Sequence, residues 1–192
     1  MKTLVSIFLA IVAVFCAPQA NAQLPPDLLG NNGSGVTDKF YSEPFYKSMD
    51  GMWVLMREHE NAGLKCSVNF ISTGQSMAIH GPWDAEMRKK GVGMVWFDGK
   101  QIPKAGDKPE RIRLDLGSLD GPQKGVPAMH LNMGEDNGMM ILFVDIRKTL
   151  KEKRDSDRIT LSMDGVQIFD LPVTQLQKAY GRLGKCMEAG KR

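Results

Sequence analysis

The sequence predicts one antiparallel all-β domain, a sandwich or a partly open barrel, followed by a C-terminal α-helix that a disulfide ties to the sheet. From Met52 onward, short apolar runs are separated by turn residues, which is typical of antiparallel strands. The last apolar residues instead recur at helical spacing. Cys66 lies in an early predicted strand and Cys186 near the end of the predicted helix, so a bridge between them would join the two.

Alternation of apolar and polar residues defines the strands. In Lys65–Ser72, the side chains of Cys66, Val68 and Phe70 fall on one face, because successive strand residues point to opposite sides. Asp98-Gly99 and Asp164-Gly165 are hairpin signals. The first of them leads into residues 100–102. The predicted strands are Met52–Arg57, Lys65–Ser72, Gln75–His80, Gly93–Phe97, Lys100–Ile102, Arg111–Leu116, Val126–Met133, Met139–Asp145, Arg158–Met163 and Val166–Asp170.

Two segments are predicted to be helical. Ile146–Lys153 is short and charged and reads as a surface turn of helix. In the last element, Thr174 and Gln177 have the spacing of a capping box, and Pro172 lies just before them. The apolar stripe that follows consists of Leu176, Tyr180, Leu183 and Met187.

Residues 1–22 have the layout of a cleaved secretory signal peptide. Lys2 precedes an apolar run, and Ala20-Asn21-Ala22 forms a small-x-small cleavage site before Gln23. The apolar run is too short for a transmembrane anchor, and no later stretch of the chain is long enough to cross a bilayer. We therefore expect a periplasmic or secreted protein whose mature N-terminus lies near Gln23.

Removal of the signal leaves two of the three cysteines. Cys16 leaves with it, and the bulky Phe15 before Cys16 disfavours lipidation at that position. Cys66 and Cys186 then enter an oxidising compartment, where we expect them to pair. For a closed loop of roughly 120 residues, the chain-entropy model gives a contribution of about 4–5 kcal/mol.

Residues 23–50 are rich in Pro, Gly, Asn and Ser and are predicted to form a flexible leader before a single domain at 51–190. Four aromatic residues lie near the end of this leader. One interpretation is that their rings clip the leader onto the domain, and this is favoured because exposed ring clusters are unusual without a partner. The other is an exposed partner-binding segment. The four residues are Phe40, Tyr41, Phe45 and Tyr46.

Two stretches carry a family resemblance: Trp53-Val54 followed by Gly63-Leu64-Lys65-Cys66, and Ile168 to Pro172 leading to Cys186. Over about residues 52–187 the chain resembles small exported alphaproteobacterial proteins related to the invasion-associated locus B family. Pro172 departs from the Gly or Ser of that pattern, and the segment from Tyr41 to Tyr46 has no counterpart in it. The resemblance implies an all-β periplasmic domain with an envelope or host-interaction (virulence-associated) role, and it brings no catalytic residues.

No metal site is predicted from the histidines. Glu58, His59 and Glu60 are consecutive, so on a strand they cannot converge on one ion. Soft Met ligands with an imidazole would suit Cu(I), and the densest such group is Met129, His130 and Met133. Core packing is favoured for these methionines, since Met129 and Met133 share a face and His130 points the other way.

No catalytic constellation is recognisable. Gly-x-Ser-x-Gly and Ser-x-x-Lys motifs are absent, and we predict no cofactor. Carboxylates on different loops could still assemble across strands. The formal charge of +3 becomes +2 without Lys2 (3 − 1 = 2), which gives no argument for nucleic acid. We therefore expect a non-catalytic interaction protein that binds an envelope component or a protein partner. The alternative is a periplasmic carrier of a small ligand or copper.

Overall fold

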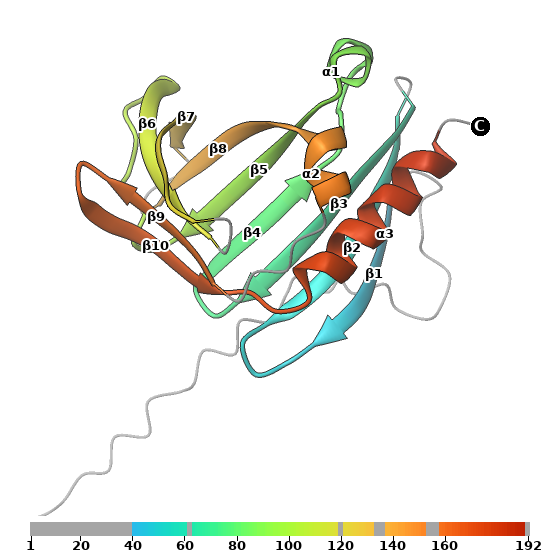
Figure 1. Cartoon of the computed structure of the whole chain (residues 1–192), viewed down its shortest axis with the longest axis horizontal. Helices are drawn as coiled ribbons and strands as arrows, with labels where there is room; N and C mark the ends of the chain where they lie inside the picture. Colours follow the sequence, from blue (N-terminus) through green and yellow to red (C-terminus); the bar gives the residue numbers. More distant parts are fainter. Residues whose placement is uncertain (1–39, 61–62, 119–120, 133–136, 153–157, 191–192) are drawn as a thin grey trace, which may run out of the picture.

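The computed structural model describes residues 40–60, 63–118, 121–132, 137–152 and 158–190. Ten strands form one sheet in which every hydrogen-bonded pair is antiparallel (Figure 1). The predicted all-β class with a C-terminal helix is confirmed. The elements are β1 (Phe40–Lys47), β2 (Met52–Glu60), β3 (Gly63–Ser72), β4 (Gln75–His80), α1 (Ala85–Lys90), β5 (Val92–Gly99), β6 (Glu110–Gly117), β7 (Gln123–Asn132), β8 (Gly138–Asp145), α2 (Ile146–Glu152), β9 (Arg158–Met163), β10 (Val166–Pro172) and α3 (Leu176–Ala189).

The sheet has the strand order β1-β2-β3-β4-β5-β8-β7-β6-β9-β10 and is open between β1 and β10. It curls so that its last hairpin meets the middle strands across the core. Phe97 of β5 and Phe169 of β10 make an edge-to-face contact with ring centroids 5.2 Å apart. The Gln75 side chain donates a hydrogen bond to the Asp170 carbonyl at 2.6 Å. The curled open sheet corresponds to the partly open barrel of the sequence prediction.

Helix α3 packs against β2 and β3 (Figure 1) and carries Cys186 of the predicted disulfide. Leu176, Ala179, Leu183 and Cys186 are buried against the sheet. The Cys66–Cys186 bridge is confirmed, with the two Cα atoms 6.1 Å apart and a sequence separation of 120 residues. The bridge therefore fixes the last turns of the chain to an early strand.

The start of α3 differs from the predicted capping box. The N-cap residue is Gln175, with φ 61°, and its side chain makes no capping hydrogen bond. Thr174 instead forms hydrogen bonds with residues of the sheet. Its carbonyl accepts a hydrogen bond from Trp53 Nε1 at 2.7 Å, and its hydroxyl donates to the Tyr46 hydroxyl at 3.4 Å. The long-range contacts of Thr174 replace the local pairing that the spacing suggested.

The boundary between the predicted leader and the domain is corrected by β1. Residues 40–47 form a strand that pairs with β2 from Phe40↔Glu58 to Lys47↔Met52, with an irregularity between Pro44 and Tyr46. The polar character of the preceding residues concealed this strand. The signal peptide at 1–22 and the rest of the predicted leader, residues 23–39, lie outside the described residues.

One local prediction between β4 and β6 is also corrected. Residues 100–102 form a turn rather than a strand, in which Ile102 N donates to the Gly99 carbonyl and the Ile102 side chain is buried. The basic run at residues 88–90 belongs to α1. Asp84 caps this helix by accepting from Met87 N at 2.7 Å, and Gly91 ends it with φ 70°. Within the described part of the chain, no helix is long and apolar enough to cross a membrane.

Candidate binding groove between α2 and α3

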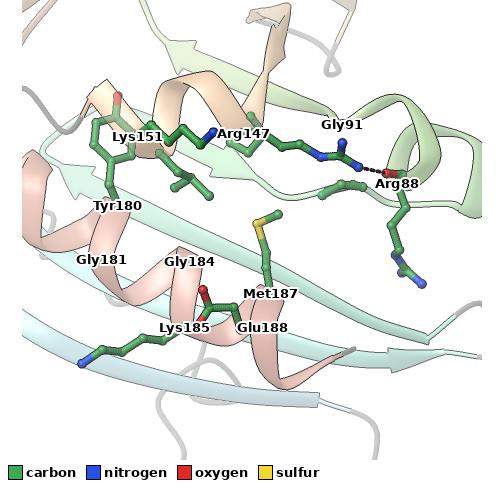
Figure 2. Close-up of a pocket in the computed structure, with 13 residues that line it drawn as sticks. Arg88, Gly91, Arg147, Lys151, Tyr180, Gly181, Gly184, Lys185, Met187 and Glu188 are labelled. Carbon is green, nitrogen blue, oxygen red and sulfur yellow. Dashed lines mark hydrogen bonds between the residues drawn. The ribbon is translucent and has the colours of Figure 1, made fainter. Parts of the chain in front are cut away.

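A groove of about 770 Å³ separates α2 from α3 (Figure 2). Its volume lies within the range of about 300–1,000 Å³ that is typical of ligand sites. The third wall is the segment that joins β4, α1 and β5. The lining residues are Pro82, Arg88, Gly91, Ile146, Arg147, Leu150, Lys151, Tyr180, Gly181, Gly184, Lys185, Met187 and Glu188.

Two glycines of α3 keep the groove open. A Cβ atom on Gly181 would meet no atom within 4 Å, and a Cβ on Gly184 would lie 4.0 Å from Leu150 Cδ1. Tyr180 and Met187 border the groove while also packing against the edge of the core. A helix of ordinary side chains would fill this space, so the glycines create the cavity at some cost in helix propensity.

Helix α2 forms the opposite wall and is anchored at its first residue. The Ile146 side chain is fully buried, and its backbone N–H donates to the Gly91 carbonyl at 3.0 Å. Arg147 and Lys151 are four residues apart and both line the groove, because residues at this spacing share a helix face. The floor at this wall is apolar, formed by Ile146 and Leu150.

Arg147 crosses the groove wall and is held at the end of α1 (Figure 2). Its Nη2 atom donates to the Arg88 carbonyl at 3.1 Å. A guanidinium group near the last carbonyls of a helix is electrostatically favourable. A Cβ atom at Gly91 would lie 2.9 Å from Arg147 Nε, and Gly91 has a φ of 70°. This glycine therefore supplies both the left-handed helix end and the room for Arg147.

The groove lining is strongly cationic. In the part of the chain that the structure describes, four basic side chains line it and Glu188 is the single carboxylate. Among the described residues, Arg147, Lys151 and Lys185 form no ion pair. In Figure 2 the Lys185 side chain extends away from the apolar floor. The groove therefore combines an apolar base with positive charge that is not internally neutralised.

The aromatic residues predicted as a partner-binding segment are largely part of the fold. Phe45 stacks near Trp53, with ring centroids 6.3 Å apart, and Arg182 of α3 lies 5.5 Å from the Phe45 ring centre. Tyr46 is hydrogen-bonded to Thr174, as described above. These contacts agree with the clip interpretation, and partner binding through Phe45 and Tyr46 stays a prediction.

Phe40 and Tyr41, the other two residues of that segment, lie at the start of β1. Tyr41 is 42% exposed, and the Arg57 guanidinium lies 4.9 Å from its ring centre. Phe40 is half-buried and borders a separate small pocket on the other face of the sheet. Of the four rings, only Tyr41 presents a largely exposed face.

The structure places two of the suggested copper ligands, Met129 and His130, on opposite faces of the sheet. Met129 packs beside Met94, Met139 and Ile141 on the outer face of the sheet. His130 is buried on the opposite face, where its Nε2 atom lies 2.7 Å from the Pro103 carbonyl. Because a carbonyl only accepts, this nitrogen carries the proton and has no lone pair for a metal. Met133 lies outside the described residues.

The remaining acidic and histidine residues show no convergence either. His59 and Glu58 are exposed at the end of β2. Within the described ranges, no group of three or more His, Cys, Asp or Glu side chains is arranged to hold a metal ion.

Comparisons with protein-family models, with curated proteins and with solved structures give no match for this chain.

The groove itself was not found from the sequence. In the sequence, several of its residues belong to the apolar stripe of the C-terminal helix or to the charged segment at 146–153. The one available signal was the pair Gly181 and Gly184 within a predicted helix, since glycine inside a helix is unfavourable unless close approach or open space requires it.

Proposed function

We propose that the protein is a non-catalytic, exported interaction protein that binds an acidic peptide segment of a partner protein in the α2–α3 groove. The observation that carries this proposal is the apolar floor bordered by Arg147, Lys151 and Lys185, none of which has an ion pair among the described residues. Rim cations of this kind steer an anionic partner and select its register.

The dimensions of the groove favour a short extended segment. Its α3 wall runs from Tyr180 to Glu188, which corresponds to about 12 Å at 1.5 Å per helical residue. An extended chain covers that length with roughly four residues at 3.3 Å each. The space above Gly181 and Gly184 accepts an apolar side chain, while carboxylates of the same segment reach the rim.

Binding can be measured with fluorescein-labelled acidic tetrapeptides that contain one apolar residue. We expect saturable binding that weakens as salt rises and falls at least tenfold in an Arg147→Glu/Lys151→Glu variant. Lys124→Glu is the matched control, because Lys124 is exposed on β7 and does not line the groove. Equal binding by the charge-reversal variant and the wild type would refute the proposal.

Glycine variants of α3 test whether peptide binding depends on the shape of the groove as well as on its charge. Gly184→Leu places a side chain into the groove while favouring the helix, so we expect a folded protein that has lost peptide binding. Gly181→Ala adds a single methyl group in open space and should raise the free energy of unfolding by about 0.5–1 kcal/mol.

A separate experiment replaces the peptides with vesicles that contain anionic lipid. Binding to vesicles without binding to any peptide would replace the peptide partner with a membrane surface.

Export is tested independently of the groove. The mature protein recovered from the periplasm or the medium should begin near Gln23 when its intact mass is measured. Retention of residues 1–22 in the recovered protein would contradict this part of the proposal.

A further inference from the structure

A trough lies on the outer face of β1–β5, away from the α2–α3 groove. Strand register places Met56, Ser67, His80 and Met94 side by side across four strands. The next row contains Asn69, Ala78 and Trp96, among others. Small side chains at the centre of these rows leave a depression between larger ones. Its volume is about 230 Å³, and its lining includes Phe40, Met56, Ser67, Asn69, Trp83 and Trp96.

Three rings form one wall of the trough. The His80 and Trp96 rings have centroids 4.2 Å apart, and Trp83 lies 5.3 Å from His80 and 4.9 Å from Trp96. Trp83 stands between β4 and α1, packs on both other rings and is half-buried. The Lys65 ammonium lies 5.3 Å from the Trp83 ring centre. The wall is therefore aromatic, with Trp83 as its outermost ring.

Two N–H groups of this wall have no acceptor. Trp83 Nε1 donates to His80 Nδ1 at 3.3 Å. An indole nitrogen can only donate, so the His80 proton lies on Nε2. His80 Nε2 and Trp96 Nε1 are both buried without a hydrogen-bond partner among the described residues. An unsatisfied buried donor destabilises the folded state, and two such donors lie side by side in a wall of one pocket.

We propose that this trough binds one neutral sugar ring, whose hydroxyl oxygens accept hydrogen bonds from His80 Nε2 and Trp96 Nε1. Both nitrogens are covered in this structure. The ligand reaches them as the Trp83 side chain, which packs on the other two rings and donates one hydrogen bond to His80, turns outward. The C–H face of the sugar then lies against the indole rings.

The polar groups of the trough match a ligand that both donates and accepts hydrogen bonds. Ser67 Oγ already accepts from the Asn69 amide at 3.1 Å, so its O–H is available as a donor. The Asn69 carbonyl and the Glu58 carboxylate supply acceptors at the other side. Arg57 is ion-paired with Glu43, and the other two charged lining residues, Lys65 and Glu58, carry opposite charges, so the lining does not select an anion. Hydroxyl groups satisfy both kinds of partner.

The size of the trough limits the ligand to a single ring. Its volume of about 230 Å³ lies below the range of about 300–1,000 Å³ for drug-sized ligands. One pyranose can be a free monosaccharide or one residue of a glycan. A free monosaccharide and a glycan residue would be recognised by the same contacts, so the experiment must distinguish these two sources.

The indole N–H groups provide a site-specific readout. The chain has three Trp residues, and Trp53 is an internal reference because its N–H is bound to the Thr174 carbonyl in the core. Full-length mature protein labelled with ¹⁵N-Trp would be titrated with the methyl glycosides of glucose, galactose, mannose and N-acetylglucosamine. We expect saturable shifts of the Trp96 and Trp83 signals for at least one sugar, with Trp53 unmoved.

Variants make the test decisive. Trp96→Phe keeps an aromatic ring but removes one N–H, and should weaken binding at least tenfold while the Trp53 signal reports an intact core. Phe143→Ser is the matched control, since Phe143 is exposed on the same face but does not line the trough. No saturable shift for any of the four sugars, or unchanged affinity in Trp96→Phe, would overturn the proposal.

Two further arms complete the experiment. Tighter binding of the trisaccharide than of the matching methyl glycoside identifies a glycan residue as the ligand, and equal affinity identifies a free sugar. The Arg147→Glu/Lys151→Glu variant should bind sugar as the wild type does. Failure of the trough and failure of the α2–α3 groove are thereby distinguished.

Discussion

At the scale of single residues, the three histidines show how position determines chemistry. His59 is exposed, whereas His80 and His130 are buried on opposite faces of the sheet. His130 is fixed by the Pro103 carbonyl. His80 is surrounded by indole rings, and this burial lowers its pKa from 6.5 to about 4. His80 is therefore neutral in the folded protein at neutral pH.

This pKa predicts acid sensitivity. The unfolded chain binds a proton at His80 near pH 6.5 and the folded chain only near pH 4, so protonation favours unfolding. The stabilisation should be complete above pH 6.5 and decline as the pH falls toward 4, by up to about 3 kcal/mol. Urea denaturation of the wild type and of His80→Gln at pH 7 and 4.5 measures this contribution.

The variant isolates the contribution of His80 from those of the other charged groups of the trough. Lys65 and Glu58 also line the trough, and both remain in His80→Gln. The loss of stability on acidification should be smaller in the variant than in the wild type. An equal loss in both proteins would show that His80 does not contribute.

At the scale of secondary-structure elements, the two outer strands show how an open sheet avoids pairing with other molecules. The irregularity at Pro44 and Tyr46 interrupts β1, and another lies between Gln167 and Phe169 of β10. Proline and bulges are recognised protections of exposed edges. Glu43 of β1 also forms ion pairs with Arg57 of β2 at 3.4 Å and with Arg182 of α3 at 3.1 Å, so the strand is joined to both elements.

Packing rather than charge should dominate the attachment of β1. Phe45→Ala removes the ring beside Trp53 and should lower the free energy of unfolding by roughly 2 kcal/mol, less than the value of about 3–5 kcal/mol for fully buried rings. Glu43→Gln breaks two ion pairs whose side chains are 31–40% exposed and should cost less than about 1 kcal/mol. Chemical denaturation of both variants gives the comparison, and a larger loss for Glu43→Gln would contradict it.

At the scale of the whole molecule, the disulfide joins parts of the fold that are far apart in sequence. Cys66 and Cys186 are 120 residues apart, and the loop between them contains β4 to β10 and most of α3. The bridge fixes α3 over β2 and β3, and α3 in turn forms one wall of the α2–α3 groove. The position of the groove thus depends on a link between the two ends of the domain.

Removing this bridge should be costly. Cys66→Ser should lower the free energy of unfolding by several kcal/mol, about 4–5 kcal/mol in the chain-entropy model, and should leave Cys186 able to cross-link chains. Thermal melting with and without reductant measures the loss, and non-reducing electrophoresis detects the dimer. The Cys66→Ser/Cys186→Ser variant should be equally destabilised without forming dimers. A wild type that melts identically with and without reductant would argue against this role.

Local sequence signals predicted much of the fold because they act over a few residues. Alternation in Lys65–Ser72 placed Cys66, Val68 and Phe70 on the core face, where all three are buried. The Asp164-Gly165 signal coincides with the turn between β9 and β10. Local signals failed where distant contacts decide the outcome. Thr174 bonds Trp53 and Tyr46 instead of capping α3, and β1 forms because β2 offers it an edge.

The sequence by itself determined the all-β class, most strands, the C-terminal helix and the cysteine pair, since these follow from residue type and short-range periodicity. Only the tertiary structure decided what these elements build together. The α2–α3 groove joins residues 82–91, 146–151 and 180–188, and the outer trough requires the register of five strands. Such sites depend on distances between segments remote in sequence, and no local pattern encodes those distances.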